Sequence, residues 1–247
     1  MHNKVALVTG GGRGIGAATC TLLAARGAQV VVNYARDESA ANRLVGEITQ
    51  AGGRAMAIQA DVRDETQVAQ MIESVVQKWG TIDILVSNAN MSFALKPLEE
   101  MAWSEFAQKL NDEMKAAFVM TKAVTPLMAK QAYGRIVYIA SGLAKRAAPR
   151  MSAHGSAKAA LVTFARYVAQ EYGPKGITAN IISPGLVRTD ATSFQSDDQL
   201  ARVAAMTPLG HVATPEDVAH AVGMYCSDDT RFVTGVYIPV NGGASME

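Results

Sequence analysis

The feature that most constrains the fold is the start of the chain, where a short apolar run leads into glycines and then into a helical pattern. Residues 4–16 read Lys-Val-Ala-Leu-Val-Thr-Gly-Gly-Gly-Arg-Gly-Ile-Gly. Gly10, Gly14 and Gly16 meet three backbone needs: a tight turn, close approach of a phosphate to main-chain N–H groups, and close helix–strand contact. We therefore predict a strand, a turn and a helix whose N-terminus binds a pyrophosphate. The alternative is a glycine-rich loop without a ligand, since the spacing departs from the commoner Gly-x-Gly-x-x-Gly.

The rest of the chain alternates between strand-like apolar runs and helical patterns. Several runs are apolar at consecutive positions, which is typical of parallel strands covered by helices on both faces. We predict a single α/β domain over residues 1–247 with a doubly wound (Rossmann) seven-stranded parallel sheet and helices on both faces. Residues 189–214 are predicted to be irregular and suit a mobile lid. The predicted strands are 5–9, 29–33, 54–59, 82–87, 134–140, 178–182 and 236–240, and the predicted helices include 17–26, 38–51, 65–79 and 152–172.

Composition excludes several classes of partner. Only 18% of residues are charged, the net charge is +1, and no block of lysine or arginine marks a site for nucleic acid or anionic lipid. The two cysteines, Cys20 and Cys226, have neither disulfide-framework nor metal-ligand spacing, so both are predicted to be buried. Neither a signal region nor an apolar run of membrane-spanning length is apparent. We expect a cytoplasmic protein with a small-molecule ligand and no metal.

The residues after the second predicted strand indicate which dinucleotide would bind. In an open parallel sheet, ligands lie beyond the carboxyl ends of the strands. Asn33, Tyr34 and Arg36 occupy this end, where a carboxylate would normally accept hydrogen bonds from the adenosine ribose. Arg13 in the glycine turn and Arg36 instead suit a 2′-phosphate, so we predict NADP(H). Two solvated surface arginines are the alternative.

The ends of the third and fourth strands carry further polar candidates. Asp61, followed by Val62, would reach an adenine edge, although a helix N-cap explains an aspartate there equally well. Asn88, followed by Ala89, would either tie neighbouring strand ends together or contact the cofactor's ribose. These positions remain ambiguous on the residues alone.

Short segments spread over the whole chain resemble the short-chain dehydrogenase/reductase family, most closely its 3-oxoacyl-[acyl-carrier-protein] reductase-like members. The resemblance implies a nicotinamide cofactor, with Lys158 on its ribose and residues 184–189 along its carboxamide. It also implies a homotetramer and an acyl substrate that is either free or bound to a carrier protein. The segments that carry it are residues 9–16, Asp61-Val62, Asn88-Ala89, Ser141, Lys158, Ser183-Pro184-Gly185 followed by Thr189, and residues 240–243. The cofactor-binding residues it implies are Gly10, Arg13, Gly14, Ile15, Gly16, Asn33, Tyr34, Arg36, Asp61, Val62, Asn88, Ala89, Lys158, Pro184, Gly185, Val187 and Thr189.

Two of the four catalytic positions depart from the family pattern. In the family, Tyr transfers the proton, Lys holds the ribose and lowers the pKa of the Tyr, Ser orients the carbonyl, and Asn anchors a water relay. Ser141 and Lys158 match this pattern, whereas His154 stands at the Tyr position and Glu113 at the Asn position. Asn90 likewise replaces a usual Gly beside the nicotinamide.

The two departures are physically related. A carboxylate at Glu113 can pair directly with the Lys158 ammonium, and we expect this pair to let His154 keep its proton. The resulting imidazolium would donate a proton to the developing alkoxide as a general acid. Because imidazole is shorter than a phenol by roughly an ångström or two, the substrate must sit deeper or a water must bridge.

Three functions fit these residues. The first is NADPH-dependent reduction of a 3-oxoacyl thioester-like or other ketone, with His154 as proton donor, Ser141 orienting the oxygen and Lys158 holding the ribose. The second is dehydration or isomerisation next to a carbonyl, with Glu113 or His154 as base. The third is a non-catalytic member of the family. An apolar substrate cleft is predicted from Met91, Ser92, Phe93, Leu95, Leu143, Ala144, Met151, Leu186 and Phe194, with a basic flank of Lys145, Arg146 and Arg150 that meets a carrier protein or is simply solvated.

Overall fold

The strands form one parallel sheet in the order β3-β2-β1-β4-β5-β6-β7 in the computed structural model, which describes residues 1–189, 192 and 195–246. Strand β1 pairs with β2 on one side and with β4 on the other, so Val8 lies level with Val32 and Val86. Strands β1 to β3 are added toward one edge of the sheet and strands β4 to β7 toward the other. This change of order between β1 and β4 opens a crevice at the carboxyl ends of the two strands. The strands are β1 (Val5–Val8), β2 (Gln29–Tyr34), β3 (Arg54–Gln59), β4 (Ile84–Ser87), β5 (Gly134–Ile139), β6 (Ile177–Pro184) and β7 (Tyr237–Val240).

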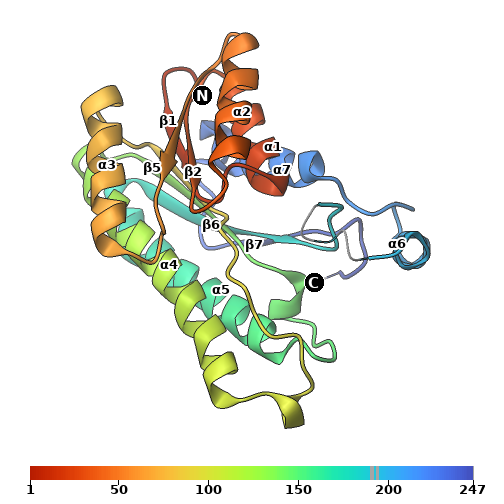
Figure 1. Cartoon of the computed structure of the whole chain (residues 1–247). Coiled ribbons are helices and arrows are strands. Elements are labelled where there is room, and N and C mark those ends of the chain that lie inside the picture. Colours follow the sequence, from red (N-terminus) through yellow and green to blue (C-terminus); the bar gives the residue numbers. More distant parts are fainter. Residues whose placement is uncertain (190–191, 193–194, 247) are drawn as a thin grey trace.

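Helices cover both faces of the sheet, as predicted (Figure 1). Side chains of β1 alternate between the two faces: Leu7 packs into a core with α3, α4 and α5, and Val8 into a core with α1, α2 and α7. Both faces are therefore apolar, and the prediction of a doubly wound fold is confirmed. The helices are α1 (Gly14–Ala25), α2 (Glu38–Gln50), α3 (Glu65–Trp79), α4 (Trp103–Lys130), α5 (Ser152–Tyr172), α6 (Asp197–Met206) and α7 (Pro215–Tyr225), with short 3-10 turns η1 (Leu98–Glu100), η2 (Gly142–Ala144), η3 (Gly173–Lys175) and η5 (Asp228–Thr230).

Three helices are not among those named from the sequence, namely α4, α6 and α7. Residues 189–214 are predicted to be irregular, but α6 lies within them, so that prediction is wrong for residues 197–206. Ser196 caps α6 and forms a capping box with Gln199, a local signal that explains the helix. The long helix α4 is not among the helices named from the sequence, and Pro126 inside it interrupts the helical pattern.

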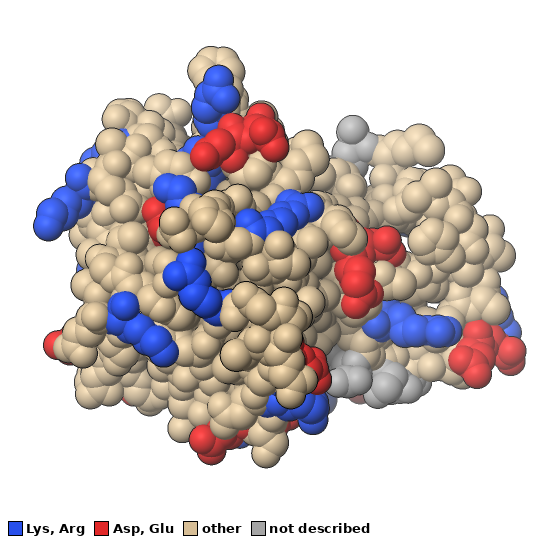
Figure 2. Space-filling view, turned by 90° about the horizontal axis from the view of Figure 1, so that it is seen from above, with Lys and Arg blue, Asp and Glu red and all other residues tan. Residues whose placement is uncertain are grey.

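The surface and the cysteines agree with the compositional reading. On the face in Figure 2, acidic and basic side chains are interspersed. Cys20 and Cys226 are buried free thiols, as predicted. Among the described residues, no helix combines the length and apolar character needed to cross a lipid bilayer.

Candidate active site

In the glycine turn after β1, backbone atoms approach one another too closely for larger side chains. Gly10 and Gly14 have positive φ angles of 60° and 52°, and a Cβ on Gly16 would overlap the carbonyl oxygen of Gly10. The helix that follows begins at an exposed residue, Arg13, without a side-chain cap and without an acidic residue in its first turn. Its first N–H groups, on Gly14, Ile15 and Gly16, have no intrahelical partners by position. This uncapped, electropositive end fits a dinucleotide phosphate.

Asn88 ties the ends of β1 and β4 together, which is one of the two roles predicted for it. Its Nδ2 donates to the carbonyl oxygens of Thr9 at 2.9 Å and Gly10 at 3.1 Å. The Thr9 hydroxyl accepts in return from the backbone N–H groups of Asn88 and Ala89 at 2.9 and 3.0 Å. Both N–H bonds of the Asn88 amide are therefore used inside the protein.

The side chains at the end of β2 are those of Asn33, Tyr34 and Arg36. Asn33 is buried, its Nδ2 donates to the carbonyl of Ala60 at 3.0 Å, and its Oδ1 accepts from the Gly10 N–H at 3.4 Å. It thus holds the glycine turn instead of projecting toward a ligand. Tyr34 is half-buried and Arg36 is exposed. Asp37 is engaged as the N-cap of α2, accepting from Ala40 at 3.0 Å.

Asp61 is fixed by a neighbouring arginine. Arg63 contacts both of its carboxylate oxygens, at 2.6 and 3.0 Å, and also binds Asp112 at 2.8 Å. The Arg63 guanidinium lowers the pKa of Asp61. The alternative prediction that Asp61 caps a helix is wrong, because Asp64 accepts from the first-turn N–H groups of α3. Val62 is buried in the core beside α3 and α4.

The segment after β6 folds back against the glycine turn. Pro184 ends β6, and the N–H of Gly185 donates to the carbonyl of Val240 at 3.0 Å. Val187 is buried. A Cβ on Gly14 would lie 3.3 Å from the side chain of Thr189, so residues 184–189 reach the same end of the sheet as the glycine turn.

A buried ionic triad lies beside the predicted catalytic residues. Glu113 on α4 accepts from Lys158 on α5 at 2.6 Å, as expected, and also from Lys109 at 2.6 Å. Lys109 is fully buried and was not predicted from the sequence. Its position four residues before Glu113 on one helix is the signal that would have found it. Lys158 also donates to the carbonyl of Ile139 at 2.8 Å.

The triad determines the charge of its members. Burial alone would raise the pKa of Glu113, but the ammonium groups of Lys158 and Lys109 outweigh it and lower the pKa to about 2. Burial lowers the pKa of Lys109, and the adjacent carboxylate opposes that shift. The three groups together carry one net positive charge in an enclosed place.

His154 is neutral at physiological pH. Burial, followed by the charges of Lys158 and Lys109, lowers its pKa to about 4, and Glu113 offsets only part of this effect. The expectation that Glu113 lets His154 keep its proton is therefore wrong, because the ring is buried and because a second ammonium group, that of Lys109, shares the carboxylate.

The surroundings of His154 leave its ring nitrogens unpaired. The residue is 8% exposed, and its ring stacks on Phe93 with centroids 4.6 Å apart. Among the described residues neither ring nitrogen has a hydrogen-bond partner, and Nδ1 is fully enclosed. Ser141 follows β5 and caps η2, accepting from the Leu143 N–H at 3.2 Å. Its hydroxyl proton remains available to a ligand oxygen.

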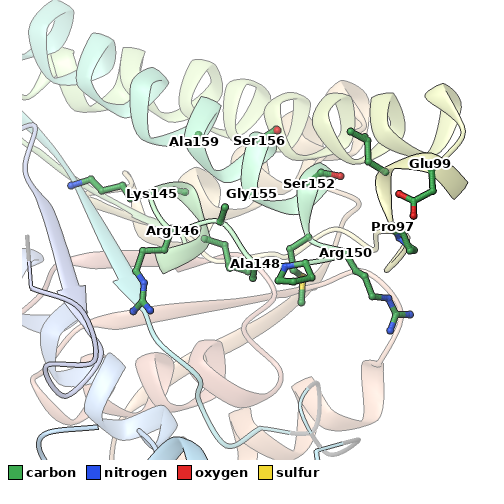
Figure 3. Close-up of a pocket in the computed structure, with 16 residues that line it drawn as sticks. Pro97, Glu99, Lys145, Arg146, Ala148, Arg150, Ser152, Gly155, Ser156 and Ala159 are labelled. Carbon is green, nitrogen blue, oxygen red and sulfur yellow. The ribbon is translucent and has the colours of Figure 1, made fainter. Parts of the chain in front are cut away.

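A pocket of about 670 Å³ opens between α5 and residues 143–152 (Figure 3). It contains only part of the predicted cleft, namely Leu143, Ala144 and Met151, together with the basic flank of Lys145, Arg146 and Arg150. Arg146 and Arg150 lie at opposite ends of the pocket and donate to the carbonyls of Ala244 and Leu95, each at 2.9 Å. Lys145 lies over the Tyr237 ring. His154 and the predicted cleft residues Met91, Ser92, Phe93, Leu95 and Leu186 do not line this pocket, and Phe194 lies outside the described residues.

Comparison with known proteins gives matches over nearly the whole chain. A family described as "Enoyl-(Acyl carrier protein) reductase" matches residues 10–245. The 3-oxoacyl-[acyl-carrier-protein] reductase of Synechocystis is 36% identical over 98% of this chain and 97% of its own length. The Escherichia coli K12 protein of the same name is 34% identical over 100% of this chain and 99% of its own.

Two solved structures are also similar over nearly their full lengths. A dehydrogenase/reductase from Sinorhizobium meliloti has a TM-score of 0.92 and 36% identity, covering 100% of this chain and 96% of that one. A mutant short-chain dehydrogenase/reductase from Serratia marcescens has a TM-score of 0.91 and 31% identity, covering 99% of both chains.

Proposed function

This chain belongs to the short-chain dehydrogenase/reductase family of oxidoreductases, and we propose that it reduces the carbonyl of a 3-oxoacyl thioester or similar ketone at the expense of NADPH. The observation that carries the proposal is the placement of Lys158. Its ammonium is held by Glu113 and by the Ile139 carbonyl, which leaves one N–H for a ribose hydroxyl. This arrangement lies at the end of the sheet where the uncapped helix α1 fits the cofactor's phosphates.

The choice of NADPH rests on charge at the end of β2. Arg13 and Arg36 are both exposed there, and Asp37 is occupied as a helix cap. A 2′-phosphate held by arginine binds strongly, whereas Asp37, as a helix cap, is not free to accept from a ribose hydroxyl. NADPH should therefore bind at least about tenfold tighter than NADH, a difference of about 1.4 kcal/mol. Titration of nicotinamide fluorescence measures this ratio, and equal affinity would contradict the assignment.

Reduction adds a hydride to the carbonyl carbon and a proton to its oxygen. The nicotinamide supplies the hydride when bound. Ser141 donates one hydrogen bond to the oxygen, and Nε2 of His154 donates a second. This assigns the imidazole proton to Nε2, because a proton on the enclosed Nδ1 would be a buried N–H without a partner. A neutral imidazole with a lowered pKa can polarise a carbonyl in this way. The proton that Nε2 passes to the oxygen is replaced from water.

Dehydration or isomerisation next to a carbonyl is an alternative reaction, for which Glu113 or His154 would act as a base. A carboxylate with a pKa of about 2 and an imidazole with a pKa of about 4 are both weak bases at neutral pH. Reduction of a carbon–carbon double bond is the other alternative, because the matched family is described as an enoyl reductase. The relatives that match over their whole length are named 3-oxoacyl-[acyl-carrier-protein] reductases, which favours the ketone.

Assembly and substrate delivery complete the proposal. We expect a homotetramer in which the outer faces of α4 and α5 are covered by other subunits, since Phe118 and Tyr167 on these faces are exposed. The acyl group would be presented free or on a carrier protein, with Arg146 and Arg150 beside the pocket as anion contacts.

Four proteins test the catalytic assignment: the natural chain, His154→Ala, His154→Tyr, and His154→Tyr combined with Glu113→Asn. With acetoacetyl thioester and NADPH, His154→Ala should lose about 10²-fold or more of the rate. His154→Tyr should restore or raise it, and the double variant should recover more because Glu113 no longer blunts the effect of Lys158 on the Tyr pKa. A crotonyl thioester serves as the enoyl control. If His154→Ala is as fast as the natural chain, the role of His154 is wrong.

A further inference from the structure

Lys109 is a buried lysine whose ammonium group has three hydrogen-bond acceptors in the protein. Its ammonium donates to Glu113 at 2.6 Å, to the Asn90 side chain at 3.0 Å and to the Met91 carbonyl at 2.8 Å. All three N–H bonds are therefore satisfied within the protein, and the side chain is 0% exposed. Such complete pairing is what an ammonium needs to remain buried with its charge.

The partners of Lys109 link it to both catalytic neighbours. Through Glu113 it is connected to Lys158 on α5. Through Asn90 and Met91 it holds the segment that follows β4, and its ammonium lies 5.4 Å from the Phe93 ring. Phe93 in turn stacks on His154. Lys109 thus contacts both neighbours of His154, namely the Glu113–Lys158 pair and the segment after β4 that contains Phe93.

The charges around His154 come from three side chains on two helices. Lys158 lies on α5 with His154 itself, and Lys109 and Glu113 lie on α4. The neighbouring segment at Phe93 contributes an aromatic ring and no charge. If Lys109 were absent, Glu113 would balance Lys158 alone, and no net positive charge would face the imidazole.

We propose that Lys109 is a positioning residue of this active site: it shares Glu113 with Lys158, fixes residues 90–93 against His154, and keeps His154 neutral and able to donate a hydrogen bond. The proposal rests on the proposed carbonyl reduction for its purpose. The arrangement itself is a property of the protein without any ligand, so it can be tested without turnover.

The test is a titration of His154 by NMR on the full chain with labelled histidine, without cofactor or substrate. The chain has four histidines, and His154→Gln identifies the signal. Lys109→Met keeps a long apolar stem but removes the charge, so the His154 midpoint should rise by about one pH unit or more. Lys96→Met is the matched control, because Lys96 pairs with Glu105 at the same 2.6 Å but is 43% exposed. It should leave the midpoint unchanged.

A double variant separates charge from packing. Lys109→Met with Glu113→Leu removes the pair as a unit and leaves Lys158 facing His154, so the midpoint should return toward that of the natural protein. The double variant also tests the proposal if Lys109→Met alone does not fold. In that case a His154 midpoint in the double variant near that of an ordinary histidine would overturn the proposal. A Lys109→Met protein that folds with an unshifted midpoint overturns it as well. A shifted midpoint in Lys109→Met, together with a natural chain that reduces no 3-oxoacyl thioester, would instead count against the proposed reaction and not against the role of Lys109.

Discussion

His154 shows how far a neighbouring charge can override residue type. Histidine usually titrates close to neutral pH, but enclosure and two ammonium groups hold this one in the neutral form. The family resemblance placed His154 at the Tyr position, and the pair between Glu113 and Lys158 was predicted from that placement. The protonation state of His154 was predicted wrongly, because it depends on the burial of the ring and on Lys109, which only the packing of α4 against the end of β4 reveals.

The lowered pKa of His154 makes stability depend on pH. Its pKa is about 6.5 in the unfolded chain and about 4 in the folded protein, so the unfolded state binds the extra proton between these values. We expect the free energy of unfolding to fall as pH decreases from 7 to 4, with up to about 3 kcal/mol due to this residue. Urea unfolding at several pH values measures this loss. His154→Gln should flatten the curve in that window, and an unchanged curve would contradict the neutral assignment.

Glu113 is expected to be more important for stability than its neighbour Asp112. Glu113→Gln leaves two buried ammonium groups without a carboxylate and should cost about 3–5 kcal/mol in the free energy of unfolding. Asp112→Asn removes a partly exposed pair with Arg63 and should cost about 1 kcal/mol or less. Denaturant unfolding at pH 7 compares the two variants. Equal losses would mean that the triad is not held as described.

At the scale of elements, the sequence predicted the strands and helices that are marked by apolar periodicity and by turn residues at their ends. All seven strands were located from apolar runs and turns, to within a few residues at their ends. α6 was missed because the Ser, Asp and Pro residues around it suggest a loop, although Ser196 and Gln199 form a capping box. α4 was missed because its amphipathic pattern is interrupted at Pro126 and because it contains the triad's charged residues on a buried face.

The glycine turn provides a test of element geometry. Gly16→Ala should strongly weaken dinucleotide binding and lower stability, since the new Cβ would overlap the Gly10 carbonyl and lie 2.7 Å from the Asn88 amide. Gly46→Ala in α2 is the matched control, because no atom lies within 4 Å of its Cβ position. It should raise stability by about 0.5–1 kcal/mol. Thermal unfolding with and without NADPH reports both effects, and a harmless Gly16→Ala would contradict the close approach described.

At the scale of the whole molecule, the two core layers leave an apolar outer face on α4 and α5. Phe118 is 49% exposed and Tyr167 is 63% exposed, and Phe118 lies beside Phe164 across the two helices. On α5 itself, Ala157, Leu161 and Ala165 are buried.

We expect light scattering to give four times the mass of one chain at micromolar concentration. Phe118→Asp should reduce that mass by placing a charge in the proposed contact. Phe232, which is fully exposed elsewhere on the surface, gives the control Phe232→Asp, which should leave the assembly intact. A monomer mass for the natural chain would refute the tetramer.

The proposed reduction transfers a hydride from the nicotinamide to a carbonyl carbon bound beside Ser141 and His154. The most direct measurement uses NADPH deuterated at the transferred position and a 3-oxoacyl thioester, with mass spectrometry of the product. We expect a 3-hydroxyacyl product that carries one deuterium, and we expect the Lys158→Met variant to form much less of this product. An alcohol without deuterium, a saturated product formed only from the enoyl thioester, or no reduced product at all would contradict the proposed reduction.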